Sequence, residues 1–298
     1  MRSFLFLVNE RARGGNAVGL LQRHLAAAPM RQLPTSMVPF VDDLGIRRGL
    51  SKLTQDMIPV AVGGDGTLAS VVRILRQVGR AEMPLGLLPM GTGNGVAHSL
   101  GMARPGCAIK ALTHGAPRGI DLMTTTHPQA PVSLLSISAG GESLAMQDFS
   151  NWRQRSRLLG ALVGGARGLR RVSGLTVEAD GERFVSPQDR ICNVGIYNAP
   201  CYGFGVTPHP RADITDGLAD LRVHRSRIRY AAYLGSAALR TVSPIDPTPD
   251  WSKLRRVTIS SPWPVQVDGE AVAAATFDVH VVPGAVRILV PGVCTKAS

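Results

Sequence analysis

The chain has 298 residues, 44% of them hydrophobic, so it is long enough to form one large or two ordinary domains with apolar cores. No stretch comes near the roughly 18 uninterrupted apolar residues of a membrane-spanning helix, and the apolar run at residues 4–8 is too short for a signal peptide. The four cysteines lack a CxxC pair, which argues against a zinc site or a disulfide framework and favours reduced thiols in a cytoplasmic protein.

The formal net charge of +12 predicts attraction to polyanions. Aromatic residues make up only 5% of the chain, so we expect no base-stacking surface and no nucleic-acid partner. The basic residues gather in segments 152–171 and 221–230. These segments predict either a solvated basic face or docking on an anionic bilayer, where each basic residue contributes about 1 kcal/mol.

Strand-like and helix-like segments alternate in the first part of the chain, which is typical of a doubly wound α/β domain. Its third helix shows an apolar face at spacings of three and four, formed by Leu68, Val71, Val72, Leu75 and Val78. The expected strands are 4–8, 35–40, 58–62 and 85–88, and the expected helices are 17–28, 43–53, 68–78 and 96–100.

From about Asp121 onward, short β-rich runs predict a mostly antiparallel β domain. Helices are expected near 157–169 and 230–239, and the three prolines of 243–249 indicate an exposed connection. We therefore place one domain at 1–120 and a second at 121–298, whose C-terminal segment can pack back on the first. The expected strands are 132–137, 175–179, 192–197, 219–223, 256–259, 265–267, 276–282 and 286–290.

The stretch IPVAVGGDGTLASVVRIL predicts a strand, a glycine turn and a helix, so free N–H groups point at whatever lies over Gly63–Thr67. It is an anion cradle without the lysine of a P-loop. A second turn of this kind, Gly91–Asn94, follows the next strand. Two such turns at the carboxyl ends of neighbouring parallel strands can clamp one polyphosphate, although each alone can be an ordinary tight turn.

Asp65 lies in the middle of the first turn, where a bare carboxylate repels a triphosphate. Its presence is explained if it faces a Mg²⁺ ion that bridges the phosphates, or if it takes a proton from an acceptor hydroxyl. Either role indicates phosphoryl transfer. Aspartate is also a favoured N-cap residue, so it can serve to cap the helix that starts near Leu68.

GGDGT followed after a strand by GTGN resembles the diacylglycerol kinase catalytic family, which includes bacterial diacylglycerol kinases, sphingosine kinases and ceramide kinases. The resemblance extends nearly end to end, through LVNERARGGNA, YNAPCYGFGVTPHPRADITDGLADL and VQVDGEAV. From the residues alone, the DGE of the last segment can equally be a hairpin turn. The positions that match the family's patterns are Asn9, Pro210, Ala212, Asp216, Gly217, Asp220, Asp268, Gly269 and Glu270.

The resemblance implies an N-terminal α/β domain like that of NAD kinases and lipid kinases, a lipid-binding β-sandwich, and an active site in the cleft between them. It implies that Asp268 is the general base, with Glu270 beside it and Asp65 second in rank for that role. It also implies Mg²⁺ near Asp65 and a second, mainly structural Mg²⁺ at Asp216 and a carbonyl near Leu218. ATP would be bound by Asn9, Gly63, Gly64, Asp65, Gly66, Thr67, Gly91, Thr92, Gly93 and Asn94.

Glu10, Arg13 and Gly95 depart from the family's pattern, and GTGNG is closer to the sphingosine and ceramide kinase form. The expected activity is transfer of the γ-phosphoryl group of ATP to a hydroxyl of a membrane lipid, such as diacylglycerol or a sphingoid base. The alternatives are an NAD kinase-like soluble nucleotide kinase and a catalytically silent nucleotide- or lipid-binding regulator. We expect a cytoplasmic protein, peripherally associated with the inner face of an anionic membrane, and a homodimer is one option for its assembly.

Overall fold

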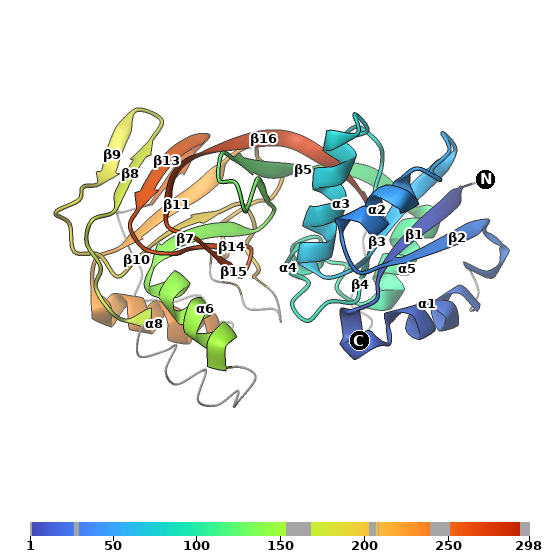
Figure 1. Cartoon of the computed structure of the whole chain (residues 1–298), viewed down its shortest axis with the longest axis horizontal. Coiled ribbons are helices and arrows are strands. Elements are labelled where there is room, and N and C mark those ends of the chain that lie inside the picture. The colour runs from blue at the N-terminus through green and yellow to red at the C-terminus, as the bar shows by residue number, and fades with distance from the viewer. Residues whose placement is uncertain are drawn as a thin grey trace. The chain divides into compact units, whose positions relative to one another are not determined.

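The computed structural model describes residues 2–26, 30–152, 168–202, 207, 209–238 and 251–292. The chain divides into two compact units, which consist of Met1–Ile120 with Gly284–Ser298 and of Asp121–Pro283. Figure 1 follows the chain through both units from blue to red. The predicted connection at 243–249 and almost all of the predicted helix at 157–169 lie outside the described residues.

The first unit contains a four-stranded parallel sheet in the order β2-β1-β3-β4. This confirms the predicted α/β fold. Strand β1 pairs with β2 on one side and with β3 on the other, and its residues Phe4–Val8 are fully buried. The strands are β1 (Ser3–Asn9), β2 (Thr35–Phe40), β3 (Met57–Gly63) and β4 (Gly86–Pro89). The helices are η1 (Ala12–Gly15), α1 (Ala17–Ala26), η2 (Met30–Gln32), α2 (Asp43–Leu50), α3 (Asp65–Gln77), α4 (Gly95–Ser99) and α5 (Pro105–His114).

Helix α3 buries the apolar face that its spacing predicts, with one exception. Leu68, Val71, Val72 and Leu75 are buried, whereas Val78 is 44% exposed. Val78 lies one residue beyond the helix, so its side chain leaves the face that the helical period defines.

The last strand of the chain contributes to the first unit. Leu85 N donates to Arg287 O at 2.8 Å, and Leu289 N donates to Leu85 O at 2.9 Å. Leu289 is buried in the same hydrophobic cluster as Phe4 and Val60. Residues from both ends of the sequence therefore complete this core.

The second unit is built from two six-stranded sheets, β12-β11-β10-β7-β14-β15 and β6-β5-β16-β13-β8-β9. The confirmed sandwich fold also includes α6 (Gly141–Trp152) and α8 (Arg227–Ala238). Strands β5 (Ala116–Thr125) and β16 (Ala275–Val290) run on into the first unit. The others are β6 (Val132–Ser133), β7 (Ser136–Gly140), β8 (Thr176–Ala179), β9 (Glu182–Val185), β10 (Asn193–Tyr197), β11 (Ala219–His224), β12 (Trp251–Leu254), β13 (Arg256–Ser261), β14 (Val265–Val267) and β15 (Glu270–Val272).

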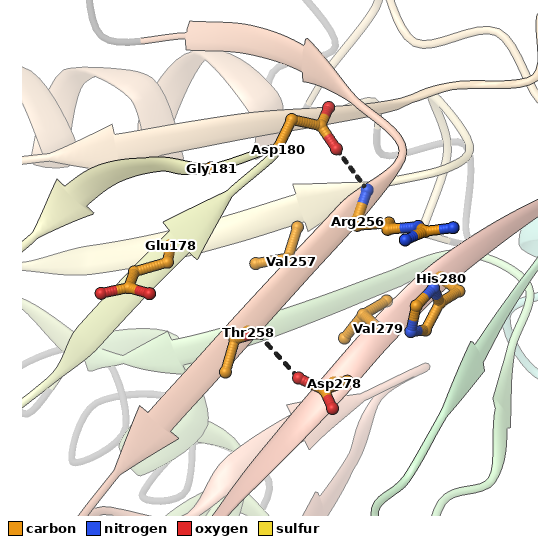
Figure 2. Close-up of a pocket in the computed structure, with 9 residues that line it drawn as sticks. All are labelled: Glu178, Asp180, Gly181, Arg256, Val257, Thr258, Asp278, Val279 and His280. Atoms are coloured by element: carbon orange, nitrogen blue, oxygen red, sulfur yellow. Dashed lines mark hydrogen bonds between the residues drawn. The ribbon is translucent and has the colours of Figure 1, made fainter.

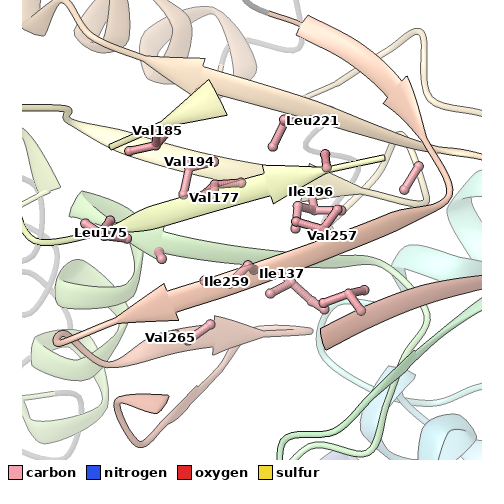
Figure 3. Close-up of a cluster of buried hydrophobic side chains, with 14 of the residues drawn as sticks. Ile137, Leu175, Val177, Val185, Val194, Ile196, Leu221, Val257, Ile259 and Val265 are labelled. Atoms are coloured by element: carbon pink, nitrogen blue, oxygen red, sulfur yellow. The ribbon is translucent and has the colours of Figure 1, made fainter. Parts of the chain in front are cut away.

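Alternate residues of these strands form one hydrophobic cluster (Figure 3). Val194 and Ile196 of β10 lie in it, as do Val177 of β8 and Ile259 of β13. Because strand side chains point alternately to opposite faces, the residues between them lie on the other face of each sheet. The side chains of Tyr197 on β10 and of Arg222 on β11 therefore face away from this core.

Two sequence expectations need correction here. Segments 276–282 and 286–290 belong to the single strand β16, although Pro283 and Gly284 between them indicate a break. Cys107 is disulfide-bonded, whereas Cys192 and Cys201 are free thiols.

In the part of the chain that the structure describes, no helix is long and apolar enough to cross a membrane.

Candidate active site

The two glycine turns of the first unit touch each other through their backbones. A Cβ atom built on Gly64 would lie 3.0 Å from Gly91 Cα, and a Cβ atom on Gly91 would overlap Gly64 Cα. Met90 N also donates to Gly63 O at 2.8 Å. The turns that follow β3 and β4 therefore form one backbone surface, and glycine is required where they meet.

Asp65 joins these turns. Its Oδ2 accepts the N–H of Gly95 at 2.8 Å, and its Oδ1 accepts the N–H of Val96 at 3.0 Å. The carboxylate thus caps α4, and the expectation that it caps α3 is wrong: α3 starts at Asp65, with Gly64 as its N-cap. A negative charge at the start of α4 is favourable, because the helix dipole is positive there.

Two asparagines fix the shape of the turns. Asn9 Nδ2 donates to Thr67 Oγ1 at 2.8 Å, which ties the end of β1 to the first turn of α3. Asn94 adopts a left-handed conformation (φ 57°), and its side chain donates to Gly91 O and accepts from Gly91 N, both at 2.9 Å. The structure thus brings together the predicted nucleotide-binding residues, since Gly66, Thr92 and Gly93 lie in the same turns.

The loop after Asn9 contains the departure at Arg13. Arg13 has φ 54°, a left-handed conformation that favours glycine, and glycine is common there in the family that the sequence resembles. The next residue, Gly14, is also left-handed, with φ 64°. The loop therefore places an arginine at a backbone position suited to glycine.

In the second unit, the carboxylate of Asp268 holds the loop between β6 and β7. It accepts the hydroxyl of Ser133 at 2.7 Å and the N–H groups of Leu134 at 2.8 Å, Leu135 at 2.9 Å and Ser136 at 3.1 Å. Burial raises the pKa of Asp268, and the hydrogen bonds from Leu134, Ser133 and the other two donors act in the opposite direction. The side chain is therefore committed to several neighbours.

Asp268 and Gly269 form the tight turn between β14 and β15, with φ values of 47° and 89°. The chain contains a second DGE segment, at Asp180–Glu182, and its Asp180 and Gly181 have φ values of 47° and 90°. Asp180 likewise accepts two backbone N–H groups, from Arg255 and Arg256, both at 3.0 Å. The aspartate of this motif thus has a structural role in both hairpins.

Glu270 opens β15 and is exposed. Among the residues that the structure describes, none forms a hydrogen bond with its carboxylate. The two acidic groups of this motif therefore differ, because Asp268 is held by four donors whereas Glu270 is exposed to solvent.

A hydrogen-bonded chain connects the Asp268 loop to the segment that contains Asp216. Buried Asn198 donates through Nδ2 to Leu134 O at 2.8 Å and to Asp121 O at 3.1 Å. The buried carboxylate of Asp121 then accepts Gly217 N at 2.6 Å. Sequence reasoning missed this role of Asp121; the signal was a carboxylate inside the apolar run of β5.

The carboxylate of Asp216 has two partners. Its Oδ1 accepts Leu218 N at 3.0 Å, and its Oδ2 forms an ion pair with Lys253 Nζ of β12. The hydrogen bond between Lys253 and Asp216 is the largest of the effects that raise the pKa of Lys253. An ammonium group of the chain thus contacts the carboxylate at which the resemblance implies a divalent cation.

A polar layer lies on the face of β10 and β11 that points away from the core. Tyr197 and Arg222 are buried there, and the Arg222 guanidinium lies 4.5 Å from the ring centre of Tyr233 on α8. Burial lowers the pKa of His224 to about 3, with smaller contributions from Arg222 and His209, so this imidazole is neutral at pH 7. Segment 221–230 is therefore not one solvated basic face, because Arg222 and His224 are buried.

A hollow of about 560 Å³ lies over β8, β13 and β16 (Figure 2). The carboxylates that line it have partners: Asp278 accepts Thr258 Oγ1 at 2.7 Å, and Glu178 pairs with Arg183. No residue that the sequence predicts for the site lines this hollow. The hollow is thus lined by other residues than the glycine turns and Glu270.

Comparison with known proteins gives these sites a context. The profile of the diacylglycerol kinase catalytic domain matches residues 3–125, and that of the YegS C-terminal NAD kinase beta sandwich-like domain matches residues 136–290. Together the two profiles cover most of the chain and indicate a lipid kinase family that combines these two domains. The chain belongs to the family of the YegS C-terminal NAD kinase beta sandwich-like domain, whose profile matches more than half of it, and its residues 3–125 are similar to the diacylglycerol kinase catalytic domain.

Individual relatives are similar over most of the chain. A protein named "Probable lipid kinase YegS-like" from Stenotrophomonas maltophilia (strain K279a) is 29% identical over 245 residues, which cover 79% of each chain. A protein of the same name from Klebsiella pneumoniae (strain 342) is 28% identical over 240 residues, 79% of this chain and 78% of that one. A diacylglycerol kinase structure from Bacillus anthracis str. Sterne has a TM-score of 0.71 at 17% identity, covers 97% of both chains, and shows a shared fold.

The contact between the glycine turns predicts the effect of one methyl group. Gly91→Ala is expected to lower the free energy of unfolding by about 1–3 kcal/mol, because the new Cβ overlaps Gly64. Gly106→Ala in α5 is the matched control, since a Cβ there meets nothing within 4 Å. Denaturant unfolding of the two variants measures the difference; equal effects would contradict the close contact.

Proposed function

We propose that this protein transfers the γ-phosphoryl group of ATP to a hydroxyl group of a membrane lipid. The observation that carries the proposal is the backbone contact between Gly64 and Gly91, which brings the two glycine turns together. Family membership and the names of the relatives support the class of reaction.

The nucleotide site in this proposal is the start of α3. The first N–H groups of a helix have no acceptor within the helix, and the helix dipole favours an anion there. Asp65 already satisfies the start of α4, which leaves the start of α3 for phosphate oxygens. Mg²⁺ that arrives with ATP would neutralise the phosphates, and in this proposal the Asp65 carboxylate lies near that ion.

Glu270 is the general base in this proposal, and Asp268 positions it. A base needs a lone pair within reach of the hydroxyl proton. Asp268 accepts four hydrogen bonds, whereas the Glu270 carboxylate is exposed, and this difference is the reason that we place Glu270 before Asp268 in this role. The second DGE hairpin supports this assignment, because its aspartate has the same structural role as Asp268.

The proposal includes peripheral docking on an anionic membrane at the start of α8. Arg227, Ile228 and Arg229 are exposed there, and Ile228 is 82% exposed. Two cations beside an apolar side chain suit the boundary between lipid headgroups and acyl chains. The protein would then act at the cytoplasmic face of the membrane.

The experiment that tests the function is a transfer assay with labelled γ-phosphate. Mg-ATP is offered to diacylglycerol, sphingosine, ceramide and phosphatidylglycerol in mixed micelles, with NAD as a parallel acceptor. We expect label in a lipid and none in NAD. Label in NAD alone would favour an NAD kinase-like enzyme, and ATP binding without transfer to any acceptor would favour a silent regulator.

The role of Glu270 is tested by Glu270→Gln, for which we expect at least a 10²-fold lower kcat at unchanged thermal stability, because the variant removes the base but no observed contact. Glu182→Gln changes the corresponding residue of the other DGE hairpin and serves as the control, with activity close to that of the unmodified protein. Undiminished turnover by Glu270→Gln would return the role of base to Asp268 or Asp65.

Docking is tested by flotation with vesicles that contain phosphatidylglycerol. The double variant Arg227→Gln/Arg229→Gln is expected to bind about 10- to 30-fold more weakly, because each basic residue near an anionic surface contributes about 1 kcal/mol. Arg47→Gln/Arg48→Gln on α2 changes the net charge equally and controls for long-range attraction. If both double variants lose the same affinity, the start of α8 is not the docking site.

A further inference from the structure

Lys253 lies where the sequence resemblance implies a structural metal ion. Strand β12 pairs antiparallel with β11, and this register places Lys253 opposite Asp220. From that position its ammonium group contacts Asp216 Oδ2, although the two residues are 37 positions apart in the sequence. The cation next to the Asp216 turn thus comes from the chain itself.

The surroundings of this ammonium group are acidic. Asp216, Asp220 and Asp213 all interact electrostatically with Lys253. Asp220 is buried, and its Oδ1 lies 3.4 Å from His209 Nε2, while Asp213 Oδ1 accepts the N–H and the hydroxyl of Thr215 at 3.0 Å and 2.7 Å. A positive charge is favourable at such a place, whether it belongs to an ammonium group or to a metal ion.

A divalent cation and Lys253 compete for the same position. Mg²⁺ requires oxygen ligands in near-octahedral geometry, and Asp216 Oδ1 already accepts Leu218 N while Oδ2 contacts Lys253. A metal ion at Oδ2 would have to displace the ammonium group and would be repelled by it at short range. The turn from Asp216 to Leu218 is also held from its other side, by the bond between Gly217 N and Asp121.

We propose that the ammonium group of Lys253 replaces the structural divalent cation at Asp216, so that this turn keeps its conformation without a bound metal ion. The ion that accompanies ATP in the first unit is not part of this inference. The inference is also independent of the acceptor lipid, because it concerns the stability of the second unit.

Thermal unfolding without nucleotide tests the replacement, with and without millimolar MgCl₂ at constant ionic strength. We expect no change in the Tm of the unmodified protein on adding Mg²⁺ or a chelator. Lys253→Met is expected to unfold about 2–4 °C lower and to recover with Mg²⁺, because the freed carboxylates can then bind the ion. Arg183→Met removes the ion pair with Glu178 in the same unit and is the control, without recovery in Mg²⁺.

Two further measurements locate the effect. The double variant Lys253→Met/Asp216→Asn is expected to lose the response to Mg²⁺, since it lacks both the ammonium group and the ligand. Titration with Mn²⁺, followed by electron paramagnetic resonance, is expected to give equal binding by the unmodified protein and by Asp216→Asn, and it remains informative if Lys253→Met does not fold. A Tm that rises with Mg²⁺ in the unmodified protein, weaker Mn²⁺ binding by Asp216→Asn, or a folded Lys253→Met that does not respond to Mg²⁺ would overturn the proposal.

Discussion

Both units depend on carboxylate groups that face backbone N–H groups. Asp65 holds the start of α4 in this way, Asp268 holds the loop between β6 and β7, and Asp121 holds Gly217. Hydrogen bonds to an ionised acceptor are stronger than those between neutral groups, and they fix loops that have no regular backbone partners. These three carboxylates therefore hold turns and loops of the chain in place.

This distinction assigns different roles to neighbouring residues of one motif. In the DGE of β14 and β15, the left-handed backbone of Asp268 turns its side chain toward Ser133 and the adjacent N–H groups, whereas Glu270 stays exposed. The hairpin at Asp180 repeats the same backbone without belonging to the predicted site. In the proposed mechanism, the exposed Glu270 accepts the proton while four donors hold Asp268, which suits phosphoryl transfer because that reaction depends mainly on positioning.

Local structure could be predicted from the sequence where apolar residues recur at one regular spacing. The apolar face of α3 and the strand–turn–helix order of Gly63–Thr67 follow from neighbours in the chain. The partner of Asp65 in α4 and that of Asp216 in β12 lie 30 or more residues away, and no spacing rule relates them. The resemblance suggested a metal ion at Asp216 because it compares motifs, and a lysine outside the motif is invisible to such a comparison.

Strand β16 has a consequence for how the protein is made. Its residues 284–290 bring Leu289 into the core of the first unit and provide the backbone partners of Leu85. When only the first 120 residues have been translated, Leu85 still lacks its backbone partners and the core still lacks Leu289. The first unit can therefore acquire all of its backbone partners only after residues 121–283 have been synthesised.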